Sequence, residues 1–411
     1  MPRSGDVDVL FLPLHRWLVA NRGSESAWAL SIASAATNLG LESLAVVGQA
    51  DRGSVRTLEA AGVAVTSLDI TPTRGFLEDS AFYWKLIKTG HRLIRSRAPR
   101  VLHHVFPFGL SQGFNPLVIV RPACPVVVGP LLYQPATDRS DEEDLDLMQG
   151  IVKHRSNRTH TQVLSPILRR LSLATLSRSN VILSDCKETR KQMEGLYPEL
   201  RMARWVILPG GGVPKDFLTA GLRSPSRYRG EGPLRIGTLT YLRRRKRVRL
   251  MLEALAGLDH REVRCEIAGD GPGLTDLRST AARLGLDSVV TFHGAVPWSK
   301  APGFLASLDV FFSLDVFPHE ALAAVQEAMM CGCAILTSGP RLLSEPVPLS
   351  YGYDIGSGGD IDTIRSVLIT FIRDGELVRR FGEAARTRAI SQFSSDAIRN
   401  TLGKVYRSLT L

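Results

Sequence analysis

The chain has 411 residues, of which 44% are hydrophobic and 22% are charged. This composition is typical of a folded globular protein and excludes a disordered chain. The length exceeds what one ordinary core accommodates, so we expect two domains. The sequence contains no apolar run of about eighteen residues and no signal-peptide pattern at its N-terminus, which favours a cytoplasmic protein without a membrane span.

The net charge of +11 suits acidic lipid headgroups, nucleic acid or phosphorylated ligands. Zinc-finger spacing, an RNP-like motif and a basic heptad array are all missing, so we do not expect nucleic acid as a partner. Peripheral contact with an acidic membrane surface stays open. The five cysteines form no CxxC pair, and we expect them to be buried free thiols.

The first half alternates short β-branched runs with amphipathic helical stretches, the pattern of a parallel sheet wrapped by helices. A helix is predicted at 24–40, and strands are predicted at 6–14, 41–48, 100–106, 124–131 and 180–186. The stretch Tyr133–Arg170 carries an acidic run followed by a basic run. We interpret this stretch as a surface excursion or a helical lid.

Three consecutive glycines, Gly210–Gly212, cannot lie in a helix or strand without cost, and they predict an interdomain hinge. The second half resumes the alternation, with strands predicted at 234–239, 264–270, 289–294, 310–315 and 334–339. The fold class is therefore α/β with two Rossmann-like, doubly wound domains. The expected divisions are 1–213, 214–392 and a C-terminal helix at 393–411 that packs back on the first domain.

Ligands of open α/β sheets bind beyond the carboxyl ends of the strands. Two unusual segments follow strands there. Gly269–Pro272 lies between a strand and a helix, where a ligand could bind, or is simply a tight turn with Asp270 as the helix cap. The basic run Arg243–Arg247 enters a helix, where cations are unfavourable unless an anion is present. A phosphate-bearing ligand resolves that conflict, and a solvated basic turn is the alternative.

The segment FPHEALAAVQEAMMCGCAILTSG places Glu320 and Glu327 seven residues apart, about two turns along one helix face. Pro318 suits the helix entry and Gly332 its end. A carboxylate inside a packed helix needs partners. Ribose hydroxyls or a nearby arginine would satisfy Glu327. His103 and His104 end a predicted strand, where a histidine can face a cleft as a hydrogen-bond partner or base, or can be structural.

Taken in order, these segments resemble family four of the retaining glycosyltransferases, which have the GT-B fold of two Rossmann-like domains. The resemblance covers roughly Leu234–Phe393 as an ordered set of motifs. The first half is similar more loosely, through the loop at Gly23, the strand ending VLHH, the stretch CKETRKQM and the linker ILPGGGVPKDF.

The resemblance implies a role for individual positions. Lys246 would hold the donor diphosphate together with an arginine such as Arg244, and Glu327 would bind the ribose hydroxyls. The backbone of His293 and Gly294 would lie near the base, and Gly23 would approach the phosphates. His104, or else His103, would contact the donor sugar. Donor contacts are implied for His319, Glu320, Ala321 and Leu322, with Glu320 in the catalytic group beside His104 and Lys246.

The sequence departs from the family pattern at three places. Thr238 stands where the family has an arginine, and one of Arg243, Arg244 or Arg245 would replace it. His319 stands eight residues before Glu327, where the family has a glutamate, with Glu320 one place later. Ala321 and Leu322 replace the family's Phe-Gly pair.

The expected function is transfer of a sugar from a nucleotide-diphosphate donor, UDP-sugar favoured, to an acceptor hydroxyl with retention of configuration. The donor would lie in a cleft between the domains, and neither a metal nor another cofactor is expected. The acceptor is open between a lipid, a polysaccharide and a small natural product. A catalytically silent nucleotide-sugar binder or partner subunit is the alternative, as is an epimerase of the same fold. A phosphorylase would need pyridoxal phosphate on a lysine, and no stretch indicates one.

Overall fold

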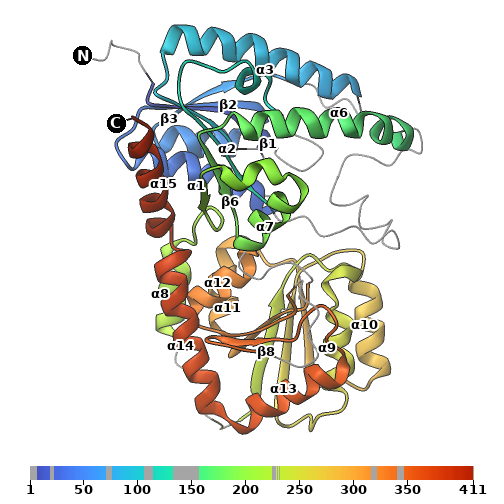
Figure 1. Ribbon diagram of the computed structural model, residues 1–411. Helices are drawn as coiled ribbons and strands as arrows, with labels where there is room; N and C mark the ends of the chain where they lie inside the picture. The colour runs from blue at the N-terminus through green and yellow to red at the C-terminus, as the bar shows by residue number, and fades with distance from the viewer. Residues whose placement is uncertain are drawn as a thin grey trace. The chain divides into compact units, whose positions relative to one another are not determined.

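The computed structural model describes residues 7–18, 23–70, 76–105, 114–132, 157–224, 228, 230, 232–315, 322–339 and 347–410. The chain divides into two compact units (Figure 1). Unit 1 comprises Met1–Gly212 and Ser395–Leu411, and unit 2 comprises Val213–Ser394. Across the described ranges, no helix combines the length and the apolar character that crossing a membrane requires.

Unit 1 is built on a seven-stranded parallel sheet with the order β3-β2-β1-β4-β5-β6-β7. The strands are β1 (Val9–Leu18), β2 (Ser43–Ala50), β3 (Val63–Ser67), β4 (Val101–His104), β5 (Val126–Leu131), β6 (Val181–Ser184) and β7 (Trp205–Ile207). Nearly every side chain of the central strands is buried, because helices cover both faces of a parallel sheet.

The two faces of this sheet carry separate apolar clusters. One cluster includes Trp28, Leu58 and Leu402, and the other includes Phe82, Leu117 and Leu176. The first face is covered by α1 (Gly23–Thr37), α2 (Arg52–Ala60) and the C-terminal α15 (Ser395–Thr410), and the second by α3 (Phe76–Arg97), α4 (Pro116–Ile119) and α6 (Asn157–Ser177). The remaining helices of unit 1 are α7 (Lys187–Leu196) and the short η1 (Pro198–Met202).

His103 joins three elements of unit 1. Its ring is fully buried, with Nε2 2.9 Å from the carbonyl oxygen of Gly129 and Nδ1 2.8 Å from the hydroxyl of Tyr406. Because a carbonyl only accepts, Nε2 carries the proton and Nδ1 accepts from the Tyr406 hydroxyl. Burial lowers the pKa of His103 to about 3, so its ring is neutral near pH 7. β4, β5 and α15 therefore share one satisfied buried polar group.

Unit 2 repeats the plan with the strand order β10-β9-β8-β11-β12-β14-β13, in which only β13 runs antiparallel to its neighbour. Its strands are β8 (Leu234–Leu239), β9 (Val263–Ala268), β10 (Val290–Gly294), β11 (Val310–Ser313), β12 (Ala334–Thr337), β13 (Val347–Leu349) and β14 (Gly352–Asp354). The unit begins with α8 (Lys215–Arg223).

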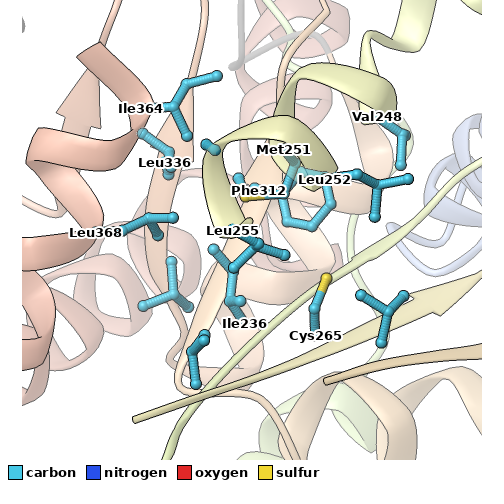
Figure 2. Packing of buried hydrophobic residues seen from close by; sticks show 14 of the residues in the cluster. Ile236, Val248, Met251, Leu252, Leu255, Cys265, Phe312, Leu336, Ile364 and Leu368 are labelled. Carbon is cyan, nitrogen blue, oxygen red and sulfur yellow. The ribbon is translucent and has the colours of Figure 1, made fainter. Parts of the chain in front are cut away.

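Amphipathic helices cover both faces of this second sheet. Figure 2 shows α9 (Val248–Leu255) placing Met251 and Leu255 against Ile236, with Ile364 and Leu368 of α13 (Ile361–Arg373) closing the same cluster. On the other face the core is formed around α12 (Ala323–Cys331). The other helices are α10 (Leu274–Arg283), α11 (Ala301–Ala306), α14 (Gly375–Gln392) and the short η2 (Arg244–Lys246) and η3 (Trp298–Lys300).

The predicted fold class of two doubly wound α/β sheets is confirmed. The strand predicted at 234–239 coincides with β8, and α12 ends at Cys331 with Gly332 in the left-handed region at φ 82°, as the sequence predicts. The sequence analysis missed β3, β7, β13 and β14. β7, β13 and β14 have only three residues, too few for a hydrophobic period to show, whereas the missed β3 has five and is longer than the predicted β4 and β6. The excursion predicted at 133–170 lies outside the described residues up to position 156. From position 157 onward, the same stretch belongs to α6.

Candidate active site

The candidate site of unit 2 lies at the carboxyl ends of its central strands. β8 has β9 on one side and β11 on the other, so the chain order reverses between β8 and β11. Loops diverge at such a switch point and leave a crevice for a ligand. The segments that follow β8, β9, β10 and β11 therefore meet at one edge of the sheet.

Two cations after β8 converge on one carboxylate after β11. Lys246 Nζ donates to Asp315 Oδ2 at 2.6 Å, and Arg245 Nη1 donates to Asp315 Oδ1 at 2.9 Å. The Asp315 side chain is fully buried, whereas 15% of the Arg245 and 17% of the Lys246 side chain stay exposed. The arrangement holds both cations at the switch point with part of each side chain open to solvent.

Asp315 was missed in the sequence analysis as a functional residue. It is the last residue of the strand predicted at 310–315, but its partners lie about seventy positions earlier in the chain. Only the adjacency of β8 and β11 brings them together. Cations are unfavourable directly before a helix such as α9, and the carboxylate of Asp315 offsets this for Arg245 and Lys246.

The neighbouring basic residues are directed elsewhere. Arg244 is exposed in η2, and Arg243 stacks over the ring of Tyr241 with 4.7 Å to the ring centroid. Arg247 donates to the carbonyl oxygens of Ser357 and Gly359 at 3.0 and 2.6 Å. Arg245 is therefore the guanidinium that the structure places beside Lys246, whereas Thr238 is buried within β8.

The loop after β9 is closed on the loop after β8 by the backbone. Gly269 and Gly271 have φ values of 133° and 151°, and a Cβ on them would lie 1.8 Å from the oxygen of Thr240 and 2.4 Å from that of Leu242. No side chain fits there, so both glycines are required by close backbone approach. The Asp270 side chain accepts from the Gly271 N–H at 2.7 Å. Asp270 thus stabilises the turn itself.

Glu327 lies on α12 and is only partly exposed. Burial raises the pKa of its carboxyl to about 7, and the Trp298 side chain, which donates a hydrogen bond to it, opposes that rise. No lysine, arginine or histidine of the described segments forms an ion pair with Glu327. The sequence left open a salt bridge from a nearby arginine to Glu327, and the described residues form no such bridge. The carboxylate can accept hydrogen bonds from a ligand.

His293 and Gly294 end β10 beside this loop. The His293 ring nitrogen Nε2 is 2.7 Å from Glu266 Oε2 on β9, and the ring contacts Phe304 edge-on. The carbonyl oxygen of Gly294 accepts from the Gly269 N–H at 2.7 Å. The backbone at the ends of β9 and β10 is therefore held in a fixed geometry.

Unit 1 has its own switch point, between β1 and β4. Gly23 begins α1 directly after the segment that follows β1, and His104 is the last residue of β4. Successive strand residues face opposite sides, so His104 points away from the face on which His103 binds Tyr406. His104 is buried, with an exposure of 1%.

Four predicted site residues directly precede α12 in the sequence. His319, Glu320 and Ala321 lie outside the described residues. Leu322 immediately precedes the first helical residue and provides no side-chain cap. The described segments contain no group of three His, Cys, Asp or Glu side chains that could hold a metal ion.

Replacing Asp315 with asparagine tests whether the carboxylate balances the two cations. The change keeps the shape but leaves Arg245 and Lys246 against a neutral amide, so we expect a loss on the order of 1–3 kcal/mol in the free energy of unfolding. Urea unfolding of both proteins measures it, and added pyrophosphate should restore part of the loss by supplying negative charge. Equal stability of Asp315→Asn and the wild type would contradict this role.

The raised pKa of Glu327 predicts a pH-dependent effect of Glu327→Gln. The protonated carboxyl contributes stability that is fully present below about pH 4.5 and is lost as the pH rises through about 7. The glutamine does not titrate, so its stability relative to the wild type should rise across this window by on the order of 1–3 kcal/mol. Melting temperatures of both proteins from pH 5 to 9 measure it, and a constant difference between them across this range would contradict the raised pKa of Glu327.

Comparisons with known proteins agree with this geometry. Residues 227–388 match the family model described as Glycosyl transferases group 1. No curated protein sequence matches the chain. Among solved structures, Anabaena HepE in complex with UDP is similar with a TM-score of 0.66, 15% identity and coverage of 98% of this chain and 100% of that one.

Two further solved structures are similar over the whole chain. A glycosyltransferase from Rickettsia africae has a TM-score of 0.67 and 12% identity, covering 99% of each chain. Sucrose-phosphate synthase from Thermosynechococcus elongatus has a TM-score of 0.63 and 14% identity, covering 98% of this chain and 99% of that one. The likeness extends over both units, so the chain as a whole has the GT-B fold, and residues 227–388 match the model of glycosyl transferases group 1.

Proposed function

We propose that the protein is a retaining glycosyltransferase that moves a sugar from a UDP-sugar to an acceptor hydroxyl. The observation that carries the proposal is the pair Arg245 and Lys246, held on buried Asp315 at the switch point of unit 2. Both cations keep part of their side chains exposed, so a lysine and a guanidinium are offered side by side to an anion. A diphosphate is an anion that suits a lysine and a guanidinium side by side.

UDP is the preferred nucleotide because the similar HepE structures contain UDP or UDP-glucose. Glu327, without an ion-pair partner among the described residues, is assigned to the ribose hydroxyls. Hydroxyl donors at this carboxylate favour its ionised form, so donor binding would lower the pKa that burial raises. The fixed backbone of His293 and Gly294 is assigned to the uracil base, and Gly23 to phosphate approach in unit 1.

In the proposed reaction the bond between the anomeric carbon and the diphosphate oxygen breaks. The acceptor oxygen bonds to the anomeric carbon, and the acceptor proton leaves with the diphosphate. Lys246 and Arg245 stabilise the charge that develops on the leaving group, so the proposal requires no metal or other cofactor. Retention rests on the resemblance to the family-four enzymes. The same resemblance assigns Glu320 to the catalytic group and His319, Ala321 and Leu322 to donor contacts.

A catalytically silent nucleotide-sugar binder is the second candidate. The observation in its favour is Thr238, which is buried in β8 at the position where the family that the chain resembles has an arginine. Arg245 supplies a guanidinium at the same strand end, which favours the enzyme. Thermal shift against UDP-, GDP- and TDP-sugars, followed by detection of free nucleoside diphosphate, tests the proposal. Binding without release of nucleotide identifies the binder, and no response to any nucleotide overturns both candidates.

We expect Lys246→Ala to reduce kcat/KM for the donor by about ten- to a hundredfold, because a charge-assisted contact to phosphate is lost. Arg245→Ala should act in the same direction. Arg244→Ala is the matched control, because Arg244 directly precedes Arg245 in the sequence and its side chain is exposed. Donor kinetics of the three variants measure the effect. A larger loss in Arg244→Ala than in Arg245→Ala would move the guanidinium role to Arg244, as the sequence first suggested.

His104 and His103 separate catalysis from structure. We assign His104 to the transferred sugar, so His104→Ala should keep UDP affinity and lose at least about tenfold in kcat, as expected for an interaction made in the transition state. His103→Ala instead leaves the Tyr406 hydroxyl and the Gly129 carbonyl without a partner and should lower the melting temperature. Titration with UDP, donor turnover and thermal melting measure the three properties. Full turnover in both variants would remove this strand end from the active site.

A further inference from the structure

One surface of unit 1 combines exposed apolar side chains with a run of positive charge that begins after Glu78 and Asp79, near the start of α3. It is formed by the outer sides of α3, α4 and α6, which we call the α3–α4–α6 face. α4 contacts both of its neighbours, and Figure 1 shows α3 and α6 crossing the same side of unit 1. The inner sides of all three helices pack on the sheet through the cluster of Phe82, Leu117 and Leu176.

The charge of this face is one-sided in the sequence itself. Residues 80–137 contain seven Lys and Arg residues and no Asp or Glu, and residues 147–184 contain six Lys and Arg residues and again no Asp or Glu. Lys88, Arg92 and Arg95 lie on the exposed side of α3. None of these three forms an ion pair within the described ranges, and no helical neighbour could offer one.

On other helices of the chain, arginines form ion pairs with glutamates of the same helix. Arg190 pairs with Glu194 on α7, Arg249 with Glu253 on α9, and Arg379 with both Glu376 and Glu383 on α14. Such pairs at a spacing of three or four residues are the usual way to solvate a helix surface. Their absence from the described parts of α3 and α6 leaves an uncompensated positive field over one face.

Large apolar side chains stand among these cations. Trp84 is 70% exposed on α3, Val120 is 74% exposed after α4, and Ile167 is 54% exposed on α6. On a helical wheel Trp84, Lys88 and Arg95 share the side opposite the buried Phe82. Tryptophan at the rim of basic helices is typical of proteins that insert into the headgroup region of a bilayer.

We propose that the α3–α4–α6 face docks on an anionic lipid bilayer, with the cations against lipid phosphates and Trp84, Ile87, Val120 and Ile167 in the interfacial layer. A nucleic acid or an acidic polysaccharide would use the charge but leave the separate exposed aliphatic side chains without a role. A bilayer accommodates both, because its charged surface covers an apolar layer. Docking would bring unit 1 to acceptors that are lipids or grow on lipids.

The test is sedimentation of the full chain with phosphatidylcholine vesicles, with and without roughly a third of phosphatidylglycerol. We expect binding only to the anionic vesicles. The triple variant Lys88→Gln/Arg92→Gln/Arg95→Gln should bind about a hundredfold more weakly, since each cation near an anionic surface contributes roughly a factor of five. It should also show a smaller dependence on salt. Trp84→Ser should weaken binding and keep the salt dependence.

The matched control is Arg52→Gln/Arg56→Gln/Arg283→Gln, which removes the same three charges from exposed positions on α2 and α10. It should bind like the wild type. Equal weakening of both triple variants, or wild-type binding to heparin or RNA but not to vesicles, overturns the proposal. A thermal shift with UDP in every variant reports folding of unit 2 separately. Failure of that shift in the wild type would count against the proposed function and leave the vesicle result to stand alone.

Discussion

The carboxylate of Asp315 is the constraint on which the unit 2 site depends. It is fully buried, and burying a lone charge costs several kcal/mol unless partners offset the cost. Arg245 and Lys246 supply those partners and in return are fixed in place at a helix entrance that would otherwise repel them. Both cations donate to the same carboxylate, and part of each side chain stays exposed. The shared carboxylate thereby fixes the lysine and the guanidinium that the proposed function assigns to the diphosphate.

The sheet topology makes this interaction available. β8 and β11 are neighbours in space although about seventy residues separate their loops, and the order of strands reverses between them. The glycine turn after β9 then holds the backbone of one loop against the next, since Gly269 and Gly271 admit no side chain. The same principle operates in unit 1, where β1 and β4 are adjacent, His104 ends β4 and Gly23 begins the helix that follows β1.

Burial favours the neutral form of both His103 and Glu327, so it lowers the pKa of the histidine and raises the pKa of the glutamate. His103 has two partners inside unit 1, and its neutral ring completes the contact between β4 and α15. Glu327 has an indole donor but no described cation, and its carboxyl becomes easier to protonate. A satisfied neutral group stabilises the fold, whereas an incompletely satisfied acid favours a site that a ligand completes. The comparison separates a structural histidine from the glutamate that the proposed function assigns to ribose.

The sequence alone determined the α/β class, the strand at 234–239, the helix end at Gly332 and the candidacy of Lys246 and Glu327, because these depend on local periodicity, capping and charge. Short strands such as β7 were missed, since three residues show no period. Tertiary structure alone decided that Arg245 accompanies Lys246, that Asp315 receives both, and that His103 binds Tyr406. Those contacts join residues about 70 to 300 positions apart, and only the pairing of distant strands and helices brings such residues into hydrogen-bonding distance.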